Sequence, residues 1–285
     1  MSELALRIAF AVVAAPAALV IIYLGGAPLA ILLSIVSAIG AWEFYRIARA
    51  AGHAPLEWLG IGMAALIPLL VHAHHAGVLL VPVSAAVVAV MAVFGVTIWA
   101  RGVEGKASGA AALTVFGVLY TGCALSFGFA LRYLGYAVDA KAGTALVAFP
   151  LLLTWASDTG AYFVGRAIGG RKLIPKVSPG KTVAGAVGGL VVTVIVAWLL
   201  ARTLLPSVAQ LSLTHAGAIL FGIVVSVAAQ IGDLAESLLK REGGVKDSSR
   251  IIPGHGGVLD RFDSLLFVLP VSYLLLPPLL NPAFR

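Results

Sequence analysis

The sequence predicts an all-α, polytopic integral membrane protein with about nine transmembrane helices. Three observations predict this fold class. Hydrophobic residues make up 61% of the 285 residues, charged residues make up only 11%, and the mean hydropathy is +1.05. The apolar residues form long runs without the alternation of a β-barrel. Because backbone polar groups in lipid need partners within their own segment, these runs are expected to be helical.

The apolar runs place the helices in order along the chain. The predicted spans are residues 4–24, 27–47, 56–76, 77–99, 109–134, 144–165, 182–203, 214–239 and 262–280. The weakest divisions are the very short connections at Gly25-Gly26 and around His75. The first run follows Arg7 as a signal peptide would, but no small-residue cleavage site follows it. We therefore expect an uncleaved first helix.

The basic residues predict the orientation of the chain. A cytoplasmic N-terminus and nine crossings place most of the 19 Lys and Arg residues on the cytoplasmic side. The two most charged loops, 166–181 and 240–261, then face the cytoplasm, which in a bacterium makes this a protein of the inner or plasma membrane. We divide the chain into N-terminal scaffold helices, 1–143, and a C-terminal catalytic region, 144–285, which holds most of the candidate chemistry.

Isolated polar residues in the first half have simple interpretations. Glu43 lies beside Trp42 and three residues before Arg46, so we place it at the membrane interface near the aromatic belt. Three histidines lie near the end of a predicted helix: His72, His74 and His75. Contact with water at that helix end explains them, and metal binding is the alternative. The single cysteine, Cys123, lies in an apolar run and is expected to be a structural thiol.

Asp158 is the first candidate functional residue, because a carboxylate inside an apolar helix is costly. Thr159 and Tyr162 lie on nearly the same helical face. The alternative is a buried aspartate that is bonded to hydroxyl groups for packing. Farther along, Gly185 and Gly189 have the GxxxG spacing of close helix packing.

The loop Ser178-Pro179-Gly180-Lys181 comes just before a predicted helix. It is not a P-loop, because Pro175 occupies the position of a required glycine. Free N–H groups at a helix N-terminus and the positive end of the helix dipole favour phosphate all the same. The loop is therefore either a phosphate-binding segment or a basic loop without a ligand.

The segment from Asp233 to Asp263 concentrates charge near the C-terminal end. Asp233, Ser237 and Lys240 fall at i, i+4 and i+7, which makes a polar stripe on one helix. Asp260 and Asp263 begin the next predicted helix and can face that stripe. Converging carboxylates without cationic partners would repel one another, which favours a hard divalent cation, Mg²⁺ or Mn²⁺.

Basic residues surround these carboxylates and suit anionic phosphate oxygens: Lys240, Arg241, Lys246, Arg250 and Arg261. Carboxylates for a metal together with cations for oxyanions are typical of phosphoryl or nucleotidyl transfer. His255, which lies between glycines, is a candidate general base or loop ligand, with a turn-stabilising role as the alternative.

One long pattern, S-x-x-K-R-x4-K-D-x-S-x2-I-P-G-H-G-G-x-x-D-R-x-D, resembles the signature of the phosphatidate cytidylyltransferase (CDP-diacylglycerol synthase) family. Its positions are occupied by Ser237, Lys240, Arg241, Lys246, Asp247, Ser249, Ile252, Pro253, Gly254, His255, Gly256, Gly257, Asp260, Arg261 and Asp263. A second block of the family is matched by Ser157, Asp158, Tyr162, Gly165, Arg166, Lys172, Leu173, Ser178, Pro179, Lys181 and Thr182. Ala184 departs from the family, which often has Glu there.

The resemblance implies an enzyme of phospholipid biosynthesis that joins CTP to phosphatidic acid with Mg²⁺, or Mn²⁺, and releases CDP-diacylglycerol and pyrophosphate. Asp233 and Asp260 would be the principal metal ligands. The implied catalytic residues are Asp233, Asp260, Lys240, Asp263 and His255. The implied substrate-binding residues are Ser178, Pro179, Lys181, Ser237, Arg241, Lys246, Asp247, Arg261 and Asp158. The expected partners are these substrates and membrane lipids, without nucleic acid, and a homodimer is possible in this family.

Two other interpretations stay open. A related lipid cytidylyltransferase or polyprenol kinase would use the same metal chemistry on another lipid. An ion-coupled transporter would also place carboxylates such as Asp158 and Asp233 within the membrane. Transporters, however, usually have paired repeats with broken helices at the midplane, and we find none in the sequence.

Overall fold

The structure, a computed structural model, describes the backbone of residues 3–252, 254 and 256–282 and the side chains from residue 12 onward within these ranges. The helices are α1 (Glu3–Leu24), α2 (Gly26–Ala50), α3 (Glu57–His75), α4 (Val83–Arg101), α5 (Ala107–Gly117), the π-helix η1 (Val118–Cys123), α6 (Ala124–Arg132), α7 (Ala140–Ile168), α8 (Val183–Arg202), the π-helix η2 (Leu205–Ala209), α9 (His215–Glu242) and α10 (Leu259–Leu279). The strands are β1 (Lys172–Ile174), β2 (Ser178–Thr182), β3 (Leu211–Leu213) and β4 (Leu280–Pro282).

The predicted fold class is confirmed. Eight helical segments in the described part of the chain are long and apolar enough to cross a membrane, and Val12–Leu24 forms a shorter apolar helix. The segment predicted at 109–134 is one span that includes η1 between α5 and α6. The cytoplasmic position of the N-terminus stays a prediction.

The helices form two compact units, each built from separate stretches of the chain. Unit 1 comprises the described parts of Met1–Val13, Gly26–Phe129 and Leu239–Arg261. Unit 2 comprises Ala14–Gly25, Ala130–Leu238 and the described part of Phe262–Arg285. The predicted division into scaffold helices, 1–143, and a catalytic region, 144–285, is a division by function. It stays a prediction.

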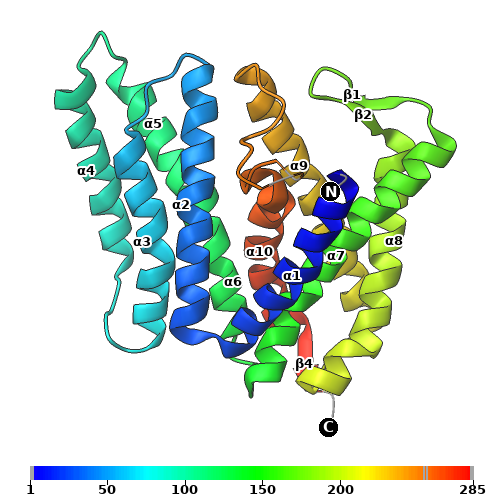
Figure 1. Cartoon of the computed structure of the whole chain (residues 1–285). Helices are drawn as coiled ribbons and strands as arrows, with labels where there is room; N and C mark the ends of the chain where they lie inside the picture. The colour runs from blue at the N-terminus through cyan, green and yellow to red at the C-terminus, as the bar shows by residue number, and fades with distance from the viewer. Residues whose placement is uncertain (1–2, 253, 255, 283–285) are drawn as a thin grey trace. The chain divides into compact units, whose positions relative to one another are not determined.

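In unit 1 the helices α2, α3 and α5 pack around a buried tyrosine. The Tyr45 side chain is fully buried, and its hydroxyl donates to the Thr114 carbonyl at 2.6 Å. Gly60 and Gly117 lie against its ring, where a Cβ would overlap ring atoms. Figure 1 shows α2 and α3 side by side, as this close approach requires.

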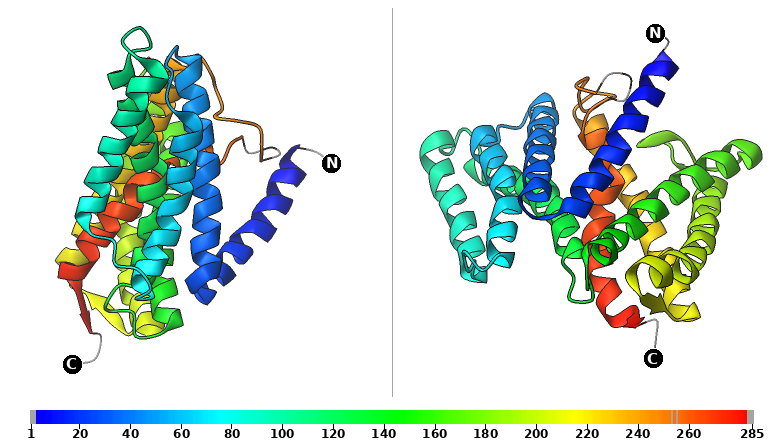
Figure 2. Two further views of the ribbon diagram at one scale, coloured as in Figure 1. Left: turned by 90° about the vertical axis from the view of Figure 1, so that its left-hand side faces the viewer. Right: turned by 60° about the horizontal axis from the view of Figure 1, so that its bottom comes forward.

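In unit 2 the helices α7 and α8 lie side by side (Figures 1 and 2), and glycines form their contact. A Cβ on Gly185 would lie 2.8 Å from the Ala161 carbonyl oxygen, and one on Gly189 would lie 2.9 Å from the Ser157 carbonyl oxygen. Both distances are shorter than real Cβ contacts, so the helices approach this closely only because these residues have no side chain. The predicted close packing at the GxxxG spacing is confirmed.

Unit 2 also holds the end of α1 through a buried arginine. Arg132 is 5% exposed, and its guanidinium donates to the Ile22 carbonyl at 2.8 Å and to the Tyr23 carbonyl at 3.0 Å. These are carbonyls of the last turn of α1, which have no partners within the helix. A cation at a helix C-terminus also interacts favourably with the helix dipole.

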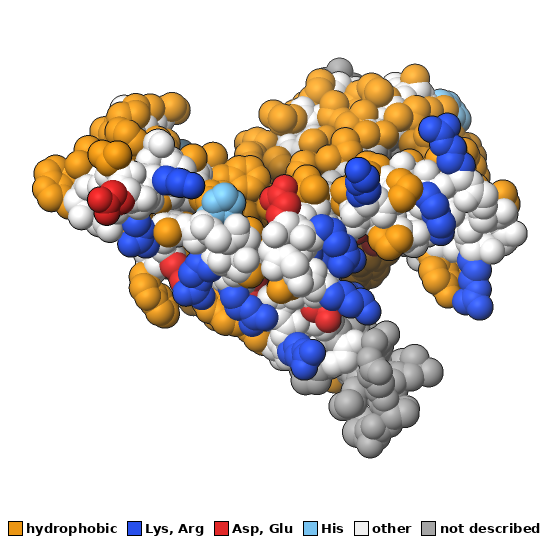
Figure 3. Space-filling view, turned by 90° about the horizontal axis from the view of Figure 1, so that it is seen from above, with side chains coloured by type: hydrophobic (Ala, Val, Ile, Leu, Met, Phe, Trp, Pro, Cys, Tyr) orange, Lys and Arg blue, Asp and Glu red, His pale blue; other side chains and the backbone are white. Residues whose placement is uncertain are grey.

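The loop expected at 166–181 contains a hairpin. Strands β1 and β2 pair antiparallel, with Lys172 opposite Thr182 and Ile174 opposite Ser178. The hairpin leads directly into α8, whose N-cap is Thr182; its hydroxyl accepts from the Gly185 N–H at 3.0 Å. Figure 3 views the end of the molecule that carries the hairpin and shows Lys and Arg side chains exposed there.

Candidate functional site

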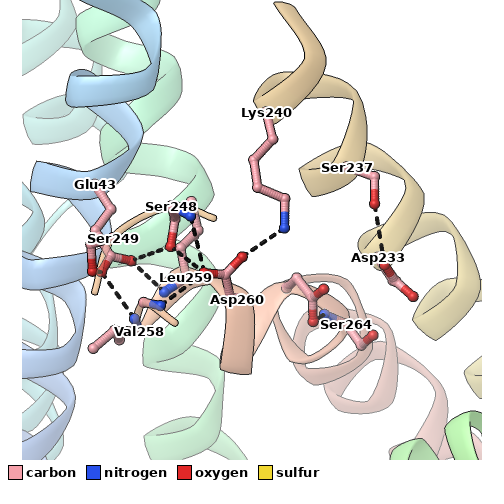
Figure 4. Close-up of polar contacts among 12 residues, drawn as sticks. Glu43, Asp233, Ser237, Lys240, Ser248, Ser249, Val258, Leu259, Asp260 and Ser264 are labelled. Atoms are coloured by element: carbon pink, nitrogen blue, oxygen red, sulfur yellow. Dashed lines mark hydrogen bonds and ion pairs between the residues drawn. The ribbon is translucent and has the colours of Figure 1, made fainter. Parts of the chain in front are cut away.

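One candidate site lies in unit 1, around Asp260 at the start of α10 (Figure 4). Its Oδ1 forms an ion pair with Lys240 Nζ at 2.6 Å. Its Oδ2 accepts from the Ser248 N–H at 3.0 Å and the Gly257 N–H at 2.8 Å, and it lies 2.9 Å from the Ser248 hydroxyl. The Asp260 and Lys240 side chains are 7% and 14% exposed, so this pair is largely withdrawn from water.

A second carboxylate of unit 1 holds the same segment from the other side. Glu43 of α2 is completely buried and has four donors within hydrogen-bond distance, one of which, the Ser248 hydroxyl, has a single proton that it shares with Asp260. Two are the hydroxyls of Ser248, at 3.0 Å, and Ser249. Two are the backbone N–H groups of Val258, at 3.0 Å, and Leu259, at 2.6 Å. Because all four donors belong to the segment before and at the start of α10, Glu43 ties this segment to α2.

A separate candidate site is a cavity of about 510 Å³ in unit 2. Asp158 of α7, Lys181 of β2 and Asp233 of α9 all line it, and Lys181 Nζ lies 2.5 Å from Asp233 Oδ2. Arg166 adds a second cation to the lining, and it donates to the Tyr162 hydroxyl at 2.8 Å. Arg166 is exposed and offers the cavity a cation for an anionic group, whereas Lys181 Nζ is buried against Asp233.

Asp158 is exposed and lines the cavity, so the alternative of an aspartate buried for packing does not describe it. Lys181 and Asp233 are only partly covered, with side chains 28% and 35% exposed. Ser178 and Pro179 precede Lys181 in β2. The Ser237 hydroxyl lies 3.4 Å from Asp233 Oδ1, which is a weak contact.

The remaining predicted residues occupy the ends of α9 and α10 and the connection between them. Asp263 accepts from the N–H of the next residue, Ser264, at 2.6 Å. Among the signature residues that the structure describes, four are exposed: Arg241, Lys246, Asp247 and Arg261. His255 lies outside the described residues.

The metal prediction assumed that the converging carboxylates have no cationic partners, but two of these carboxylates form ion pairs with lysines. Lys181 pairs with Asp233, and Lys240 pairs with Asp260. Repulsion between bare carboxylates is therefore no argument for a metal here. Asp233 and Asp260 belong to different units, and their convergence on one ion stays a prediction. Among the described residues, no group of three or more His, Cys, Asp and Glu is arranged to hold a metal.

A sequence model of the cytidylyltransferase family matches residues 5–278. The chain belongs to this family. Relatives within the cytidylyltransferases include the phosphatidate cytidylyltransferases of Bacillus subtilis, 48% identical over 134 residues, and Haemophilus influenzae, 46% identical over 144 residues. The enzyme of Staphylococcus haemolyticus is 40% identical over 166 residues. These matches cover 47–58% of the chain and 48–59% of each relative, so the chain spans about half the length of the curated relatives that it matches.

The family resemblance seen in the sequence is thus confirmed, but the interpretation of Glu43 as an interfacial residue is wrong. Its side chain is 0% exposed and lies against the signature segment. Nothing close to Glu43 in the sequence indicates this, because its partners lie more than 200 residues later. Ser248 was also missed, since it occupies an unspecified position of the signature between Asp247 and Ser249.

Proposed function

We propose that this chain is a phosphatidate cytidylyltransferase that transfers the cytidylyl group of CTP to phosphatidic acid. A phosphate oxygen of phosphatidic acid attacks the α-phosphorus of CTP. The bond from that phosphorus to the bridging oxygen of the β-phosphate breaks, and pyrophosphate leaves with the electron pair. The products are CDP-diacylglycerol and pyrophosphate.

The observation that carries this proposal is the family match over residues 5–278, with relatives named phosphatidate cytidylyltransferase at 40–48% identity. The geometry supports it in two ways. The signature segment holds Asp260 and Lys240 in one ordered network, and the cavity of unit 2 presents basic side chains. Anionic phosphates are the ligands that such side chains bind best.

The chain's own residues have distinct parts in this reaction. The phosphate of phosphatidic acid is already anionic at neutral pH, so the attack needs no strong general base. The main requirement is to bind and neutralise the phosphates of both substrates. Lys181 and Arg166 suit this task within unit 2, and Lys240 suits it within unit 1. The hairpin segment from Ser178 to Lys181 is our candidate for binding the nucleotide.

A divalent cation, Mg²⁺ or Mn²⁺, is part of the proposal. The Asp233 carboxylate fits a hard cation, because its oxygens are the ligands that such a cation prefers and its side chain is 35% exposed. Asp260 would have to release its ion pair with Lys240 to bind one. When bound, such an ion would neutralise charge on the reacting phosphates. In the structure, Lys181 and Lys240 hold the two carboxylates in place by ion pairing.

We also propose that the site faces the cytoplasm, where CTP is available, because this orientation places most Lys and Arg residues inside. Inside-out membrane vesicles test this side directly, since their cytoplasmic face is turned to the medium. CTP added to them should be consumed without permeabilisation. Consumption only after permeabilisation would reverse the proposed orientation.

The function is tested with purified protein in mixed micelles, supplied with labelled CTP and phosphatidic acid. Asp260→Asn and Asp233→Asn should each lower turnover per folded molecule about 100-fold or more, because each removes a charged group from the proposed reaction centre. Glu57→Gln is the control, since Glu57 pairs only with the exposed Arg49 at 2.6 Å among the ion pairs of the described residues. Near-normal turnover in both aspartate variants would refute the assignment of these carboxylates.

Assays with other lipids distinguish the proposed enzyme from a related lipid cytidylyltransferase or a polyprenol kinase. A polyprenol or another anionic lipid that is consumed in preference to phosphatidic acid would change the substrate. Ion flux through proteoliposomes without CTP would favour a transporter instead.

A further inference from the structure

We propose that Glu43 is a positioning residue for Asp260: from α2 it fixes the segment around Ser248 and the first turn of α10, and so sets the direction of the Asp260 carboxylate. The catalytic consequence rests on the proposed function, but the positioning itself does not. Glu43 lies in the half of the chain that we predicted to be scaffold. Its entire network belongs to unit 1 (Figure 4).

The first argument is the number of donors that Glu43 receives. A buried carboxylate is very costly unless each oxygen is hydrogen-bonded. Here Oε1 accepts from the Ser249 hydroxyl and from the Val258 N–H at 3.0 Å. Oε2 accepts from the Ser248 hydroxyl at 3.0 Å and from the Leu259 N–H at 2.6 Å. Hydrogen bonds to an ionised acceptor are about twice as strong as neutral ones, so the three donors that serve Glu43 alone, with Ser248 shared between Glu43 and Asp260, fix the segment firmly.

The second argument is where two of these donors lie. Val258 and Leu259 stand at the N-terminus of α10, where backbone N–H groups have no partner within the helix. Glu43 supplies the missing acceptors and places a negative charge at the positive end of the helix dipole. The next residue is Asp260. The carboxylate of α2 therefore fixes the helix turn from which Asp260 projects.

The third argument is the bridge between the two carboxylates. The Ser248 hydroxyl lies 3.0 Å from Glu43 Oε2 and 2.9 Å from Asp260 Oδ2, and the Ser248 N–H donates to Asp260 Oδ2 as well. Gly257 allows this approach, because a Cβ there would overlap both the Ser248 hydroxyl and Glu43. A displacement of Ser248 from Glu43 would therefore move a residue that makes two contacts with Asp260.

Glu43 itself is no catalytic residue. It is 0% exposed, and both its oxygens are occupied by the four donors, so no substrate reaches it. Its effect passes through the residues that it holds. This distinguishes it from Lys240, which contacts the Asp260 carboxylate directly at 2.6 Å.

The test compares Glu43→Gln with Glu43→Asp. The Gln variant keeps the size of the side chain but turns one acceptor oxygen into an NH₂ group. That group faces a backbone N–H, of Val258 or of Leu259, which cannot reverse its polarity. The Asp variant keeps the charge but is one methylene shorter. Glu57→Gln is the matched control, a glutamate of the same unit that forms an ion pair with the half-exposed Arg49.

The first measurement is backbone hydrogen exchange over residues 244–260 in the purified protein without substrates. Glu43→Gln should speed exchange of this peptide about tenfold, because the loss of one such bond costs about 1.4 kcal/mol or more. Glu57→Gln should leave it unchanged. Unchanged exchange in Glu43→Gln would overturn the proposal, whatever the enzymatic activity.

The second measurement is kinetics per folded molecule with CTP and phosphatidic acid. Glu43→Gln should lower kcat about 10–100-fold, as removal of outer supporting contacts does in other sites, and should raise the Mg²⁺ concentration for half-maximal rate. KM for phosphatidic acid should stay within about twofold, and Glu43→Asp should recover part of kcat. A lower thermal stability with unchanged kcat and Mg²⁺ dependence would show a merely structural role and overturn the proposal.

Two further results keep the outcomes separate. If Glu43→Gln does not fold, Ser249→Ala removes one of the four donors and should show the same changes at smaller size. No change in exchange or kcat there would overturn the proposal. If the wild-type protein does not turn over CTP with phosphatidic acid, the proposed function fails, while the exchange measurement still decides whether Glu43 positions the segment.

Discussion

Replacement of Asp260 by asparagine is expected to destabilise the protein more than the same replacement of Asp233. Both aspartates pair with a lysine at nearly the same distance, 2.6 Å to Lys240 and 2.5 Å to Lys181. The pairs differ in burial. The side chains of the Asp260 pair are 7% and 14% exposed, whereas those of the Asp233 pair are 35% and 28% exposed.

The magnitudes follow from that difference. An asparagine at 260 keeps one oxygen for the donors of Ser248 and Gly257 but presents its NH₂ group to the Lys240 ammonium. Removal of one partner from a buried pair leaves an uncompensated charge and costs about 3 kcal/mol of unfolding free energy. At Asp233 the carboxylate side chain is 35% exposed, so solvent screens this pair more although Lys181 Nζ itself is buried, and the loss should be about 1 kcal/mol.

The assay is denaturant unfolding of the purified protein in mixed micelles, with a double-mutant cycle for each pair. Lys240→Met and Lys181→Met are the second single mutants of the two cycles, and each is also combined with the asparagine variant of its partner. The coupling energy should exceed about 1.5 kcal/mol for Asp260 with Lys240 and stay below about 1 kcal/mol for Asp233 with Lys181. Equal losses for the two asparagine variants, or the larger coupling at Asp233, would refute the reasoning from burial.

Two more predictions concern the helices that carry the cavity. Gly189→Ala should cost about 2 kcal/mol of stability, because its Cβ would lie 2.9 Å from the Ser157 carbonyl oxygen; Gly95→Ala, whose Cβ meets nothing within 4 Å, should be neutral or stabilising by at most about 1 kcal/mol. Thermal unfolding of both variants compares them, and similar midpoints would contradict the close contact. Thr182→Val should cost about 1 kcal/mol by removing the hydroxyl that accepts from Gly185 N–H, whereas Thr182→Ser should retain stability; equal losses would argue against this N-cap.

The sequence predicted the spans well because membrane helices are marked by apolar length alone. It did less well at their ends. The run that begins at residue 77 was expected to be helical at once, yet α4 begins only at Val83, after an extended Pro82. The β1–β2 hairpin was also missed, since its strands are short and basic and contain Pro179. Hydropathy carries no information on such segments.

The candidate site was predicted as far as its residues lie close together in the chain. The spacing of Lys240 and Asp260 within one signature pointed to a common site, and they form an ion pair at 2.6 Å. Lys181 and Asp233 were each singled out, but their pairing was not foreseen. Glu43 was misinterpreted, because a local pattern cannot distinguish a glutamate at an interface from one buried against a distant segment.

The contacts of Glu43 also bear on the order in which the helices pack during synthesis of the protein. Its serine and backbone partners lie 205 to 216 residues farther along the chain. During translation the second helix therefore enters the bilayer long before any of them has left the ribosome. A carboxylate without donors is poorly tolerated in an apolar interior. The α2 helix thus reaches its final packing only when the last span arrives, and a nascent chain that stops early retains an unsatisfied acid.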